Sequence, residues 1–393
     1  MAERIYLDWN ATAPLCGPAR AAMLAALDMI GNASSVHSEG RATRRLIETA
    51  REQVAALVGA EARNVVFTSG GTEANALALT PAIEQAGAKA PFDRLLVSAM
   101  EHASVRSGGR FPHGSVEEIP ATRDGIVDLS RLRSRLAELK AANQRALVSI
   151  MHANNETGVV QPVAAAAEMV HAAGFLLHVD AVQTAGRIPC DIRALSADLL
   201  TVSGHKLGGP QGSGALIKAA ESLHLADPLI KGGGQERGSR AGTENVAAIA
   251  GFGAAALARS AQMTAHGPAI AALRERLESG LKAIAADTVI FGAGAERLPN
   301  TTLFAVAGCK AETALIALDL DGIAVSSGSA CSSGKVAASH VLAAMGVTAD
   351  LAGGAIRVSL GPDTAEREIQ GFLEAWRKLI SRLSSREKRG LAA

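Results

Sequence analysis

The chain has few aromatic residues and few cysteines. Aromatic side chains make up 3% of its 393 residues, which argues against the stacking platforms on which many proteins bind nucleic-acid bases. The four cysteines (Cys16, Cys190, Cys309 and Cys331) are scattered, and the lack of a CxxC pair disfavours a metal knuckle or a disulfide framework. Neither sign of charge dominates, because 39 Lys and Arg residues stand against 38 Asp and Glu residues. No global field therefore favours nucleic acid or an acidic membrane.

Long hydrophobic runs are also missing. The longest, residues 246–258, ends at Arg259 and is shorter than the about 20 residues that a membrane span needs. The N-terminal residues lead straight into Ile5 without the apolar core of a signal peptide. With 48% hydrophobic residues the chain can bury a core without disulfides or metals. These features predict a cytoplasmic protein with no nucleic-acid or membrane partner and no metal.

What the sequence does contain is an alternation of short β-branched runs with helical stretches rich in Ala, Leu and Glu. The runs that predict strands buried on both faces lie at residues 64–68, 94–98, 146–150, 174–179, 198–202 and 214–217. They predict an α/β fold whose large domain has a mostly parallel sheet flanked by helices. In such sheets, ligands bind beyond the carboxyl ends of the strands.

The pattern changes after about residue 260. A helix over residues 268–286, with Pro268 in its first turn, precedes a series of short strands and a final helix that starts at Ala365. The short strands are expected near residues 288–291, 301–304, 323–325 and 355–360. These elements predict a smaller α+β domain. We expect a large domain over residues 16–259 and a small domain built from residues 1–15 and 260–393.

Three segments that follow strands carry groups suited to one anionic ligand. Residues 68–75 form a small-residue turn before a helix, where backbone N–H groups can bind a phosphate or simply cap the helix. Asp180 ends an apolar strand and is costly to bury without a cation such as a protonated pyridine nitrogen, although it could equally cap the next helix. Lys206 lies among glycines, where a Schiff base would remove its charge, and the alternative is a surface lysine. On successive strands, Asp180 and Lys206 are what pyridoxal phosphate requires.

Three further segments are open to more than one interpretation. Residues 326–334 are small and polar, and we expect a mobile loop that exposes Cys331; the local sequence alone favours an incidental thiol over a nucleophile. Residues 231–245 form a basic, glycine-rich segment that can approach an anion or serve as a solvated linker. Residues 289–297 begin like a dinucleotide fingerprint, but Arg297 occupies the third glycine position, so we do not expect a nucleotide site there.

Taken in order, the motifs resemble those of the cysteine desulfurases, in the class-V aminotransferase group of fold-type I pyridoxal-phosphate enzymes. The likeness is strongest to the nitrogen-fixation and iron–sulfur-cluster type and covers nearly the whole chain. The segments that carry it are residues 6–12, 67–73, 101–102, 154–158, 178–183, 203–206, 232–245 and 326–331. Trp9 and Gln211 depart from the pattern, which often has Tyr and Lys at these positions.

The resemblance implies an enzyme that converts L-cysteine to L-alanine and transfers the sulfur to Cys331 as a persulfide. It implies pyridoxal 5′-phosphate as the cofactor, a homodimer, and delivery of sulfur to an iron–sulfur scaffold or another acceptor protein. Lys206 would form the Schiff base and move the substrate α-proton. His102 would stack on the cofactor ring and take part in acid–base chemistry. The loop with Cys331, at about residues 326–337, would belong to the small domain.

The resemblance also implies the binding residues. For the cofactor they are Gly71, Thr72, Ser203 and His205 at the phosphate, Asp180 at the pyridinium nitrogen, Gln183 at the ring hydroxyl, and Thr243 of the partner subunit. For the substrate they are Asn32, Asn155 and Arg357, whose planar fork matches a carboxylate.

Two alternatives stay open. One is another pyridoxal-phosphate enzyme of the same fold, an aminotransferase or a cysteine or selenocysteine lyase, in which Cys331 would be dispensable. The other is a non-catalytic interaction protein of sulfur assembly, which would lack a competent lysine or cysteine. The sequence does not identify the sulfur acceptor, which could serve nitrogenase, general cluster assembly or tRNA thiolation.

Overall fold

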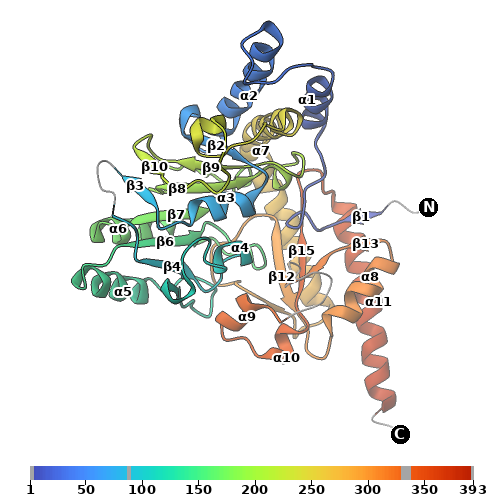
Figure 1. Cartoon of the computed structure of the whole chain (residues 1–393). Coiled ribbons are helices and arrows are strands. Elements are labelled where there is room, and N and C mark those ends of the chain that lie inside the picture. The colour runs from blue at the N-terminus through green and yellow to red at the C-terminus, as the bar shows by residue number, and fades with distance from the viewer. Residues whose placement is uncertain (1–3, 86–89, 329–337, 391–393) are drawn as a thin grey trace.

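A seven-stranded sheet forms the centre of the larger part of the molecule (Figure 1). The computed structural model describes residues 4–85, 90–328 and 338–390, with side chains to residue 383. The strand order is β2-β9-β8-β7-β6-β4-β5, and only β9 runs antiparallel to its neighbours. The strands are β2 (Val65–Thr68), β4 (Arg94–Ser98), β5 (Val116–Ile119), β6 (Ala146–Met151), β7 (Leu176–Asp180), β8 (Leu199–Ser203) and β9 (Gly214–Lys218). The expected mostly parallel sheet is therefore confirmed.

Successive side chains of these strands enter two different cores, because the strand repeat is two residues. Leu177 and Val179 pack in one core with residues from helices α2, α5, α6 and α7 (Val246–Ile284), whereas Leu176 packs in the other with residues from α3. The helices of this part are α1 (Gly17–Leu27), α2 (Ser38–Leu57), α3 (Gly71–Ala78), α4 (Ala103–Arg106), α5 (Leu129–Ala141) and α6 (Val163–Ala173). A two-stranded antiparallel sheet of β3 (Ile83–Gln85) and β10 (Leu223–Leu225) lies at its margin. The sheet is thus covered on both faces.

The C-terminal part is a smaller α+β unit that also contains the start of the chain. Its antiparallel sheet has the order β11-β12-β15-β14, and β1 (Ile5–Tyr6) pairs in parallel with β13 (Ile323–Ala324). The other elements are β11 (Val289–Ile290), β12 (Thr301–Ala305), β14 (Ser326–Ser327), β15 (Ile356–Ser359), α8 (Ala311–Leu320), α9 (His340–Ala344), α10 (Ala349–Ala352) and α11 (Glu366–Gly390). Phe304, Phe372 and Trp376 meet ring to ring in its core.

Helix α7 (Val246–Ile284) joins the two parts, and it corrects the expected helix start at Pro268. The helix runs through Pro268, although a proline removes one backbone hydrogen bond. Packing at both ends supports this, because Phe252 lies in the large core and Leu277 in the small one. Among the described residues, α7 has the length and composition of a membrane span, and 44% of its most apolar window is buried inside the molecule.

Two further expectations can be compared with the structure. The polar segment expected to be a loop from residue 326 instead begins with strand β14, because pairing with β15 uses the backbone and needs no apolar side chains. Residue 331 and its neighbours 329–337 lie outside the described residues. After β11, turns lead to β12 without an intervening helix, as expected for a segment that is not a dinucleotide site.

Candidate active site

A cavity of about 310 Å³ opens at the carboxyl ends of β6, β7 and β8, where Met151, Asp180 and Ser203 contribute to its wall. Residues from the N-terminal segment and from β15 close it on the side of the small unit. It brings together most of the predicted site residues, namely Gly71, Thr72, His102, Asn155, Asp180, Gln183, Ser203, His205, Lys206 and Arg357. The position follows from the parallel strands, whose carboxyl ends meet at one edge of the sheet.

Three predicted residues are not placed in this cavity. Asn32 is exposed, and its side-chain oxygen accepts a hydrogen bond from the backbone N–H of Ser34 at 2.8 Å. Thr243 is exposed as well and does not line the cavity of its own chain. Cys331 lies outside the described residues. Burial raises the pKa of Cys190 to about 12 and also raises the pKa of Cys309, so neither of these thiols is suited to act as a thiolate nucleophile.

Asp180 is a buried carboxylate with only 6% of its surface exposed. One of its oxygens accepts a hydrogen bond from Asn75 Nδ2 at 2.9 Å, and the other accepts from the backbone N–H of Val182 at 2.9 Å. No salt bridge to Asp180 is found within the described part of the chain. A buried carboxylate that lines a cavity and has no salt bridge can accept a hydrogen bond from a cationic group of a ligand.

The turn before α3 leaves room for a ligand close to the backbone. A Cβ atom on Gly71 would lie 3.0 Å from Val182 Cγ2 and 3.4 Å from the Cβ of Ser203, so a larger residue would crowd this wall. Thr72 follows in the first turn of the helix, where backbone N–H groups have no partner within the helix. Gly71, Thr72 and the Ser203 hydroxyl thus form a cradle suited to an anion.

Lys206 and His205 lie together in the short helix η3 (Gly204–Lys206), which directly follows β8. The Lys206 ammonium donates hydrogen bonds to the carbonyl oxygens of Asn10 and Ala11. Burial, together with the charges of Lys206 and Arg187, lowers the pKa of His205 to about 4. His205 is therefore neutral at physiological pH and can act as a hydrogen-bond donor or acceptor without adding a charge.

His102 caps the N-terminus of α4 and belongs to a chain of hydrogen bonds that the sequence did not reveal. Its Nδ1 atom lies 2.8 Å from the Ser104 hydroxyl and accepts from the Ser104 backbone N–H at 3.2 Å, which leaves the proton of the neutral ring on Nε2. Ser104 in turn accepts from Asn75 Nδ2 at 2.9 Å, the same amide group that donates to Asp180. Asn75 therefore links the carboxylate to the imidazole.

Arg357 reaches the cavity from β15 and is almost fully buried. Its Nη2 atom pairs with Asp8 at 2.8 Å, and its Nη1 atom donates to the carbonyl oxygen of Asn155 at 3.0 Å. Its Nε atom is buried without a hydrogen-bond partner. The guanidinium thus keeps donor capacity in a wall of the cavity, where it can bind a carboxylate.

Sequence reasoning quoted Asn10 only as part of a motif, but the structure makes it a junction between the two parts. The side chain is 1% exposed and donates to Thr301 Oγ1 at 2.9 Å and to the carbonyl oxygen of Asn155 at 3.2 Å. Its oxygen accepts from Asn300 Nδ2 at 3.1 Å. Both the oxygen and the nitrogen of this buried amide therefore have hydrogen-bond partners. The only sequence signal for this role was the place of Asn10 within a recognisable motif.

Two buried carboxyl groups near the site were also missed. Burial and the nearby Asp180 raise the pKa of Glu101 well above its usual range, and its carboxyl accepts a hydrogen bond from the Met151 N–H at 2.5 Å. Burial raises the pKa of Glu156 to about 7, against the influence of the Ser339 hydroxyl 2.6 Å away. Burial of this kind depends on the tertiary structure and has no local signal in the sequence.

The cavity fits pyridoxal 5′-phosphate. The unneutralised Asp180 matches a protonated ring nitrogen, the cradle around Gly71 matches a phosphate, and Lys206 in the same cavity matches an aldehyde. The buried oxygen of Asn75, which lines the cavity without a hydrogen-bond partner, offers one further acceptor.

Comparisons with known proteins agree with this geometry. The family model described as aminotransferase class-V matches residues 5–372. A cysteine desulfurase of Cereibacter sphaeroides is 44% identical over 391 residues, 97% of either chain. The protein named cysteine desulfurase IscS of Dictyoglomus turgidum is 38% identical over 388 residues, 98% of this chain and 96% of that one. An X-ray structure of a NifS-like protein from Rickettsia africae superposes with a TM-score of 0.86 at 37% identity, covering 96% of this chain and 100% of that chain.

Proposed function

This chain belongs to the class-V aminotransferases and, among them, to the cysteine desulfurases, and from that premise we propose which groups bind and which react. The cavity binds pyridoxal 5′-phosphate and L-cysteine, and the substrate sulfur is transferred to Cys331 as a persulfide. The single observation that carries this proposal is that Asp180 and Lys206, from the ends of neighbouring strands, line one cavity together with Arg357.

When bound, pyridoxal phosphate supplies an electron sink for the carbon–hydrogen bond that breaks at the substrate α-carbon. The negative carboxylate of Asp180 would pair with the ring nitrogen and keep that nitrogen protonated. Gln183 donates to the ring hydroxyl. Gly71, Thr72, Ser203 and His205 hold the phosphate, and the neutral state of His205 suits a hydrogen bond rather than an ion pair.

Arg357 and Asn155 orient the substrate carboxylate. Asp8 and the carbonyl oxygen of Asn155 fix the Arg357 guanidinium before the substrate binds. Lys206 moves the α-proton, and its position among the carbonyl oxygens of Asn10 and Ala11 gives the free ammonium a defined resting place. Ser104 holds His102 through Nδ1. The imidazole ring is then left for stacking on the cofactor, and Nε2 for proton transfer.

In the net reaction, the Cβ–S bond of L-cysteine breaks and an S–S bond forms at the Cys331 thiolate. The proton of the substrate thiol balances the hydrogen that Cβ gains, so the products are L-alanine and an enzyme-bound persulfide without a separate oxidant or reductant. The persulfide then passes to an iron–sulfur scaffold or another acceptor protein.

We further propose a cytoplasmic homodimer whose subunits complete each other's sites. The exposed position of Thr243, outside the cavity of its own chain, supports a role in the partner's site. Within each chain we propose a large domain, residues 16–259, and a small domain, residues 1–15 and 260–393. The division is supported by the separation of the core that contains Phe252 from the core that contains Leu277, and by the pairing of β1 with β13.

The proposed function is tested by alanine release from L-cysteine in the presence of a thiol reductant. We expect the purified protein to release alanine and to show a cofactor absorption band that Lys206→Ala alters, whereas Cys331→Ser retains the band and releases almost no alanine. Cys309→Ser is the matched control, because this buried cysteine is expected to be silent. Equal alanine release by the wild type and Cys331→Ser would show a lyase instead. No alanine from the cofactor-loaded wild type would point to an aminotransferase.

A further inference from the structure

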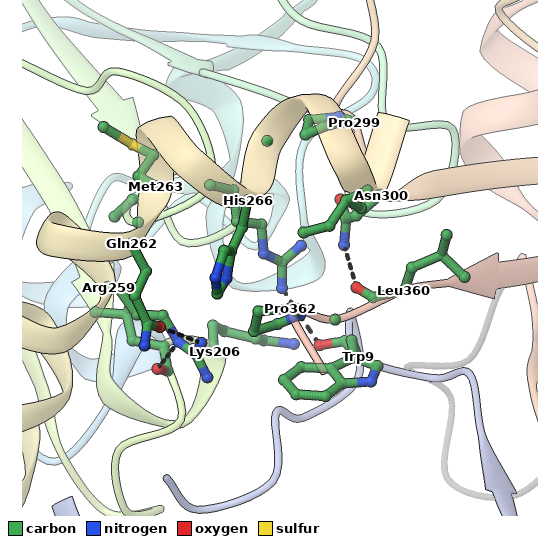
Figure 2. A pocket seen from close by; sticks show the side chains of 17 residues that line it. Trp9, Lys206, Arg259, Gln262, Met263, His266, Pro299, Asn300, Leu360 and Pro362 are labelled. Carbon is green, nitrogen blue, oxygen red and sulfur yellow. Dashed lines mark hydrogen bonds between the residues drawn. The ribbon is translucent and has the colours of Figure 1, made fainter. Parts of the chain in front are cut away.

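Arg187 lies behind the cavity wall that Gln183 forms, on the turn after β7. It lines a second, smaller cavity of about 50 Å³, which shares Lys206 with the first and has Trp9 and Arg259 in its walls (Figure 2). The residues that the structure describes contain no carboxylate in a salt bridge with Arg187. Arg187 is half-buried, and a partly desolvated cation without a neutralising partner costs free energy, so its hydrogen-bond partners deserve a functional explanation.

The hydrogen bonds of Arg187 all go to uncharged oxygens. Nη1 donates to Asn10 Oδ1 at 2.5 Å and to Gln183 Oε1 at 2.8 Å, and Nη2 donates to the carbonyl oxygen of Trp9 at 3.3 Å. Burial, with smaller contributions from the cations Arg357 and Arg259, lowers the pKa of Arg187 to about 9. The guanidinium therefore remains charged at neutral pH and can only donate.

This donor fixes the orientation of the Gln183 amide. A guanidinium accepts no hydrogen bonds, so the Gln183 oxygen must face Arg187. On the other side, Gln183 Nε2 donates to the carbonyl oxygen of Asn10 at 3.1 Å, and a carbonyl can only accept. Both partners thus require the same orientation, which leaves the NH2 group of Gln183 on the side away from Arg187.

The Asn10 side chain is oriented by the same guanidinium. Its oxygen accepts from Arg187 and from Asn300 Nδ2, while its nitrogen donates to Thr301 Oγ1. Asn300 is itself held by the carbonyl oxygen of Leu360 at 3.0 Å, a contact visible in Figure 2. Arg187 therefore connects the cavity wall to a fully hydrogen-bonded junction with the small unit.

We propose that Arg187 is a positioning residue that directs the NH2 group of Gln183 at the ring hydroxyl of the bound cofactor. The inference rests on the proposed function, which places that hydroxyl beside Gln183. A primary amide has two N–H donors, and Asn10 takes one of them, so the second can stabilise the ionised ring oxygen. Without Arg187 only the Asn10 carbonyl oxygen holds the amide in this orientation, so the reversed amide, whose oxygen favours the protonated ring oxygen, becomes more populated.

The pH at which the absorption of the bound cofactor titrates reports this change. Other charged or titratable groups line the two cavities and are unchanged in the Arg187 variants; they are Asp180, His102, His205, Lys206, Arg357, Arg259 and His266. Any difference between wild type and an Arg187 variant therefore arises at Arg187 and Gln183.

The experiment is a pH titration of holoenzyme absorption. We expect Arg187→Gln to move the midpoint upward by about one pH unit, because the donor and the positive charge that favour the ionised oxygen are both lost. Arg187→Lys keeps the charge but has a single nitrogen for three acceptors, so its shift is smaller and in the same direction. Arg259→Gln is the matched control, since Arg259 bonds Leu207 and Gln262 rather than Gln183, and it should titrate like the wild type.

Repeating the titration in a Gln183→Leu variant separates the effect of Arg187 on the Gln183 amide from a general structural effect. In Gln183→Leu protein, we expect Arg187→Gln to shift the midpoint by less than half of its effect in the wild type. A wild-type midpoint in Arg187→Gln, or equal shifts in the two backgrounds, would overturn the proposal. If Arg187→Gln does not fold, the Arg187→Lys titration decides, and an unshifted midpoint there also overturns it. Failure of the proposed function is distinguishable, because it would appear in the wild type as the lack of any cofactor band.

Discussion

One amide group, that of Asn75, connects the two sides of the proposed cofactor site. It donates to Asp180 and to Ser104, which holds His102. The local sequence singled out Asp180 as an aspartate at the end of an apolar strand, with a helix cap as the alternative, whereas only the family resemblance implied a role for His102. Asn75 gave no such signal, since an asparagine inside the first turns of a helix has many ordinary explanations.

A single substitution can test whether the reaction needs the negative charge of Asp180. Asp180→Asn keeps the shape of the side chain but removes the negative charge that would hold the ring nitrogen protonated. We expect alanine release to fall by about 100-fold or more, the range seen when one preorganised electrostatic partner is removed. The measurement is the rate at saturating L-cysteine in protein whose cofactor content is determined by absorbance.

A nearby buried carboxyl provides the control for this prediction. Burial and Asp180 raise the pKa of Glu101, which disfavours its charged form, and Glu101→Gln keeps the shape of the side chain and an acceptor for the Met151 N–H. We expect Glu101→Gln to retain alanine release within a few-fold of the wild type. A loss as large as that of Asp180→Asn would show that shape, rather than charge, limits the reaction at this position.

At the scale of elements, the segment after β6 is tied to α9 through one carboxyl group. Glu156 is 3% exposed and accepts from the hydroxyl of Ser339, the residue that caps α9. Its pKa is raised from 4.5 to about 7, so the folded protein keeps a proton that the unfolded chain loses at lower pH. This stabilising contribution is complete below pH 4.5 and is lost as the pH rises to 7.

We therefore expect Glu156→Gln to remove one component of the pH dependence of stability. Relative to the variant, the wild type should lose about 3 kcal/mol of unfolding free energy between pH 4.5 and pH 7. Urea unfolding of both proteins at several pH values measures the difference. Glu52→Gln, at an exposed position, should leave the dependence as in the wild type, and a flat difference for Glu156→Gln would contradict the prediction.

Helix α7 shows how packing overrides a local signal. Pro268 predicted a helix start, but the apolar residues on either side belong to two cores, and one continuous helix lets both be buried. Pro268 is exposed, so its main local effect is the missing hydrogen bond.

We expect Pro268→Ala to raise the unfolding free energy by about 1–3 kcal/mol, because alanine restores the donor and suits a helix interior. Ala269→Gly, at the next exposed position, should lower the unfolding free energy by about 1 kcal/mol and calibrates the helix propensity of this turn. Thermal and urea unfolding measure both. Destabilisation by Pro268→Ala would contradict the prediction and show that α7 needs the proline ring at this turn.

At the scale of the whole molecule, the prediction concerns how two subunits share a site. Lys206 lines the cavity of its own chain, whereas Thr243 is exposed and would act in the partner's site. Lys206→Ala and Thr243→Ala homodimers should both have low activity. After subunit exchange, a mixed dimer has one site with the intact Lys206 of one chain and the intact Thr243 of the partner subunit.

Mixing the two variants should therefore restore up to about half of the wild-type activity per mixed dimer, as expected when a site is assembled from two chains. Alanine release before and after exchange measures this, and sedimentation verifies the dimer. No recovery after confirmed exchange would place Thr243 in its own chain's site or outside any site.

The sequence by itself determined the fold class, six of the seven strands of the large sheet and the order of the site motifs; it missed β5, in which two glutamates interrupt the apolar run. These follow from local patterns: apolar runs, the small residues of turns, and chemically distinctive residues such as Asp180 and Lys206 directly after strands. Only the tertiary structure decided which uncharged and buried groups complete the site. The Asn75 bridge, the Asn10 junction, the raised pKa of Glu101 and the position of Arg187 without a carboxylate partner all depend on contacts between distant segments. Burial and hydrogen-bond direction are properties of the neighbours in space, and a linear pattern does not encode them residue by residue.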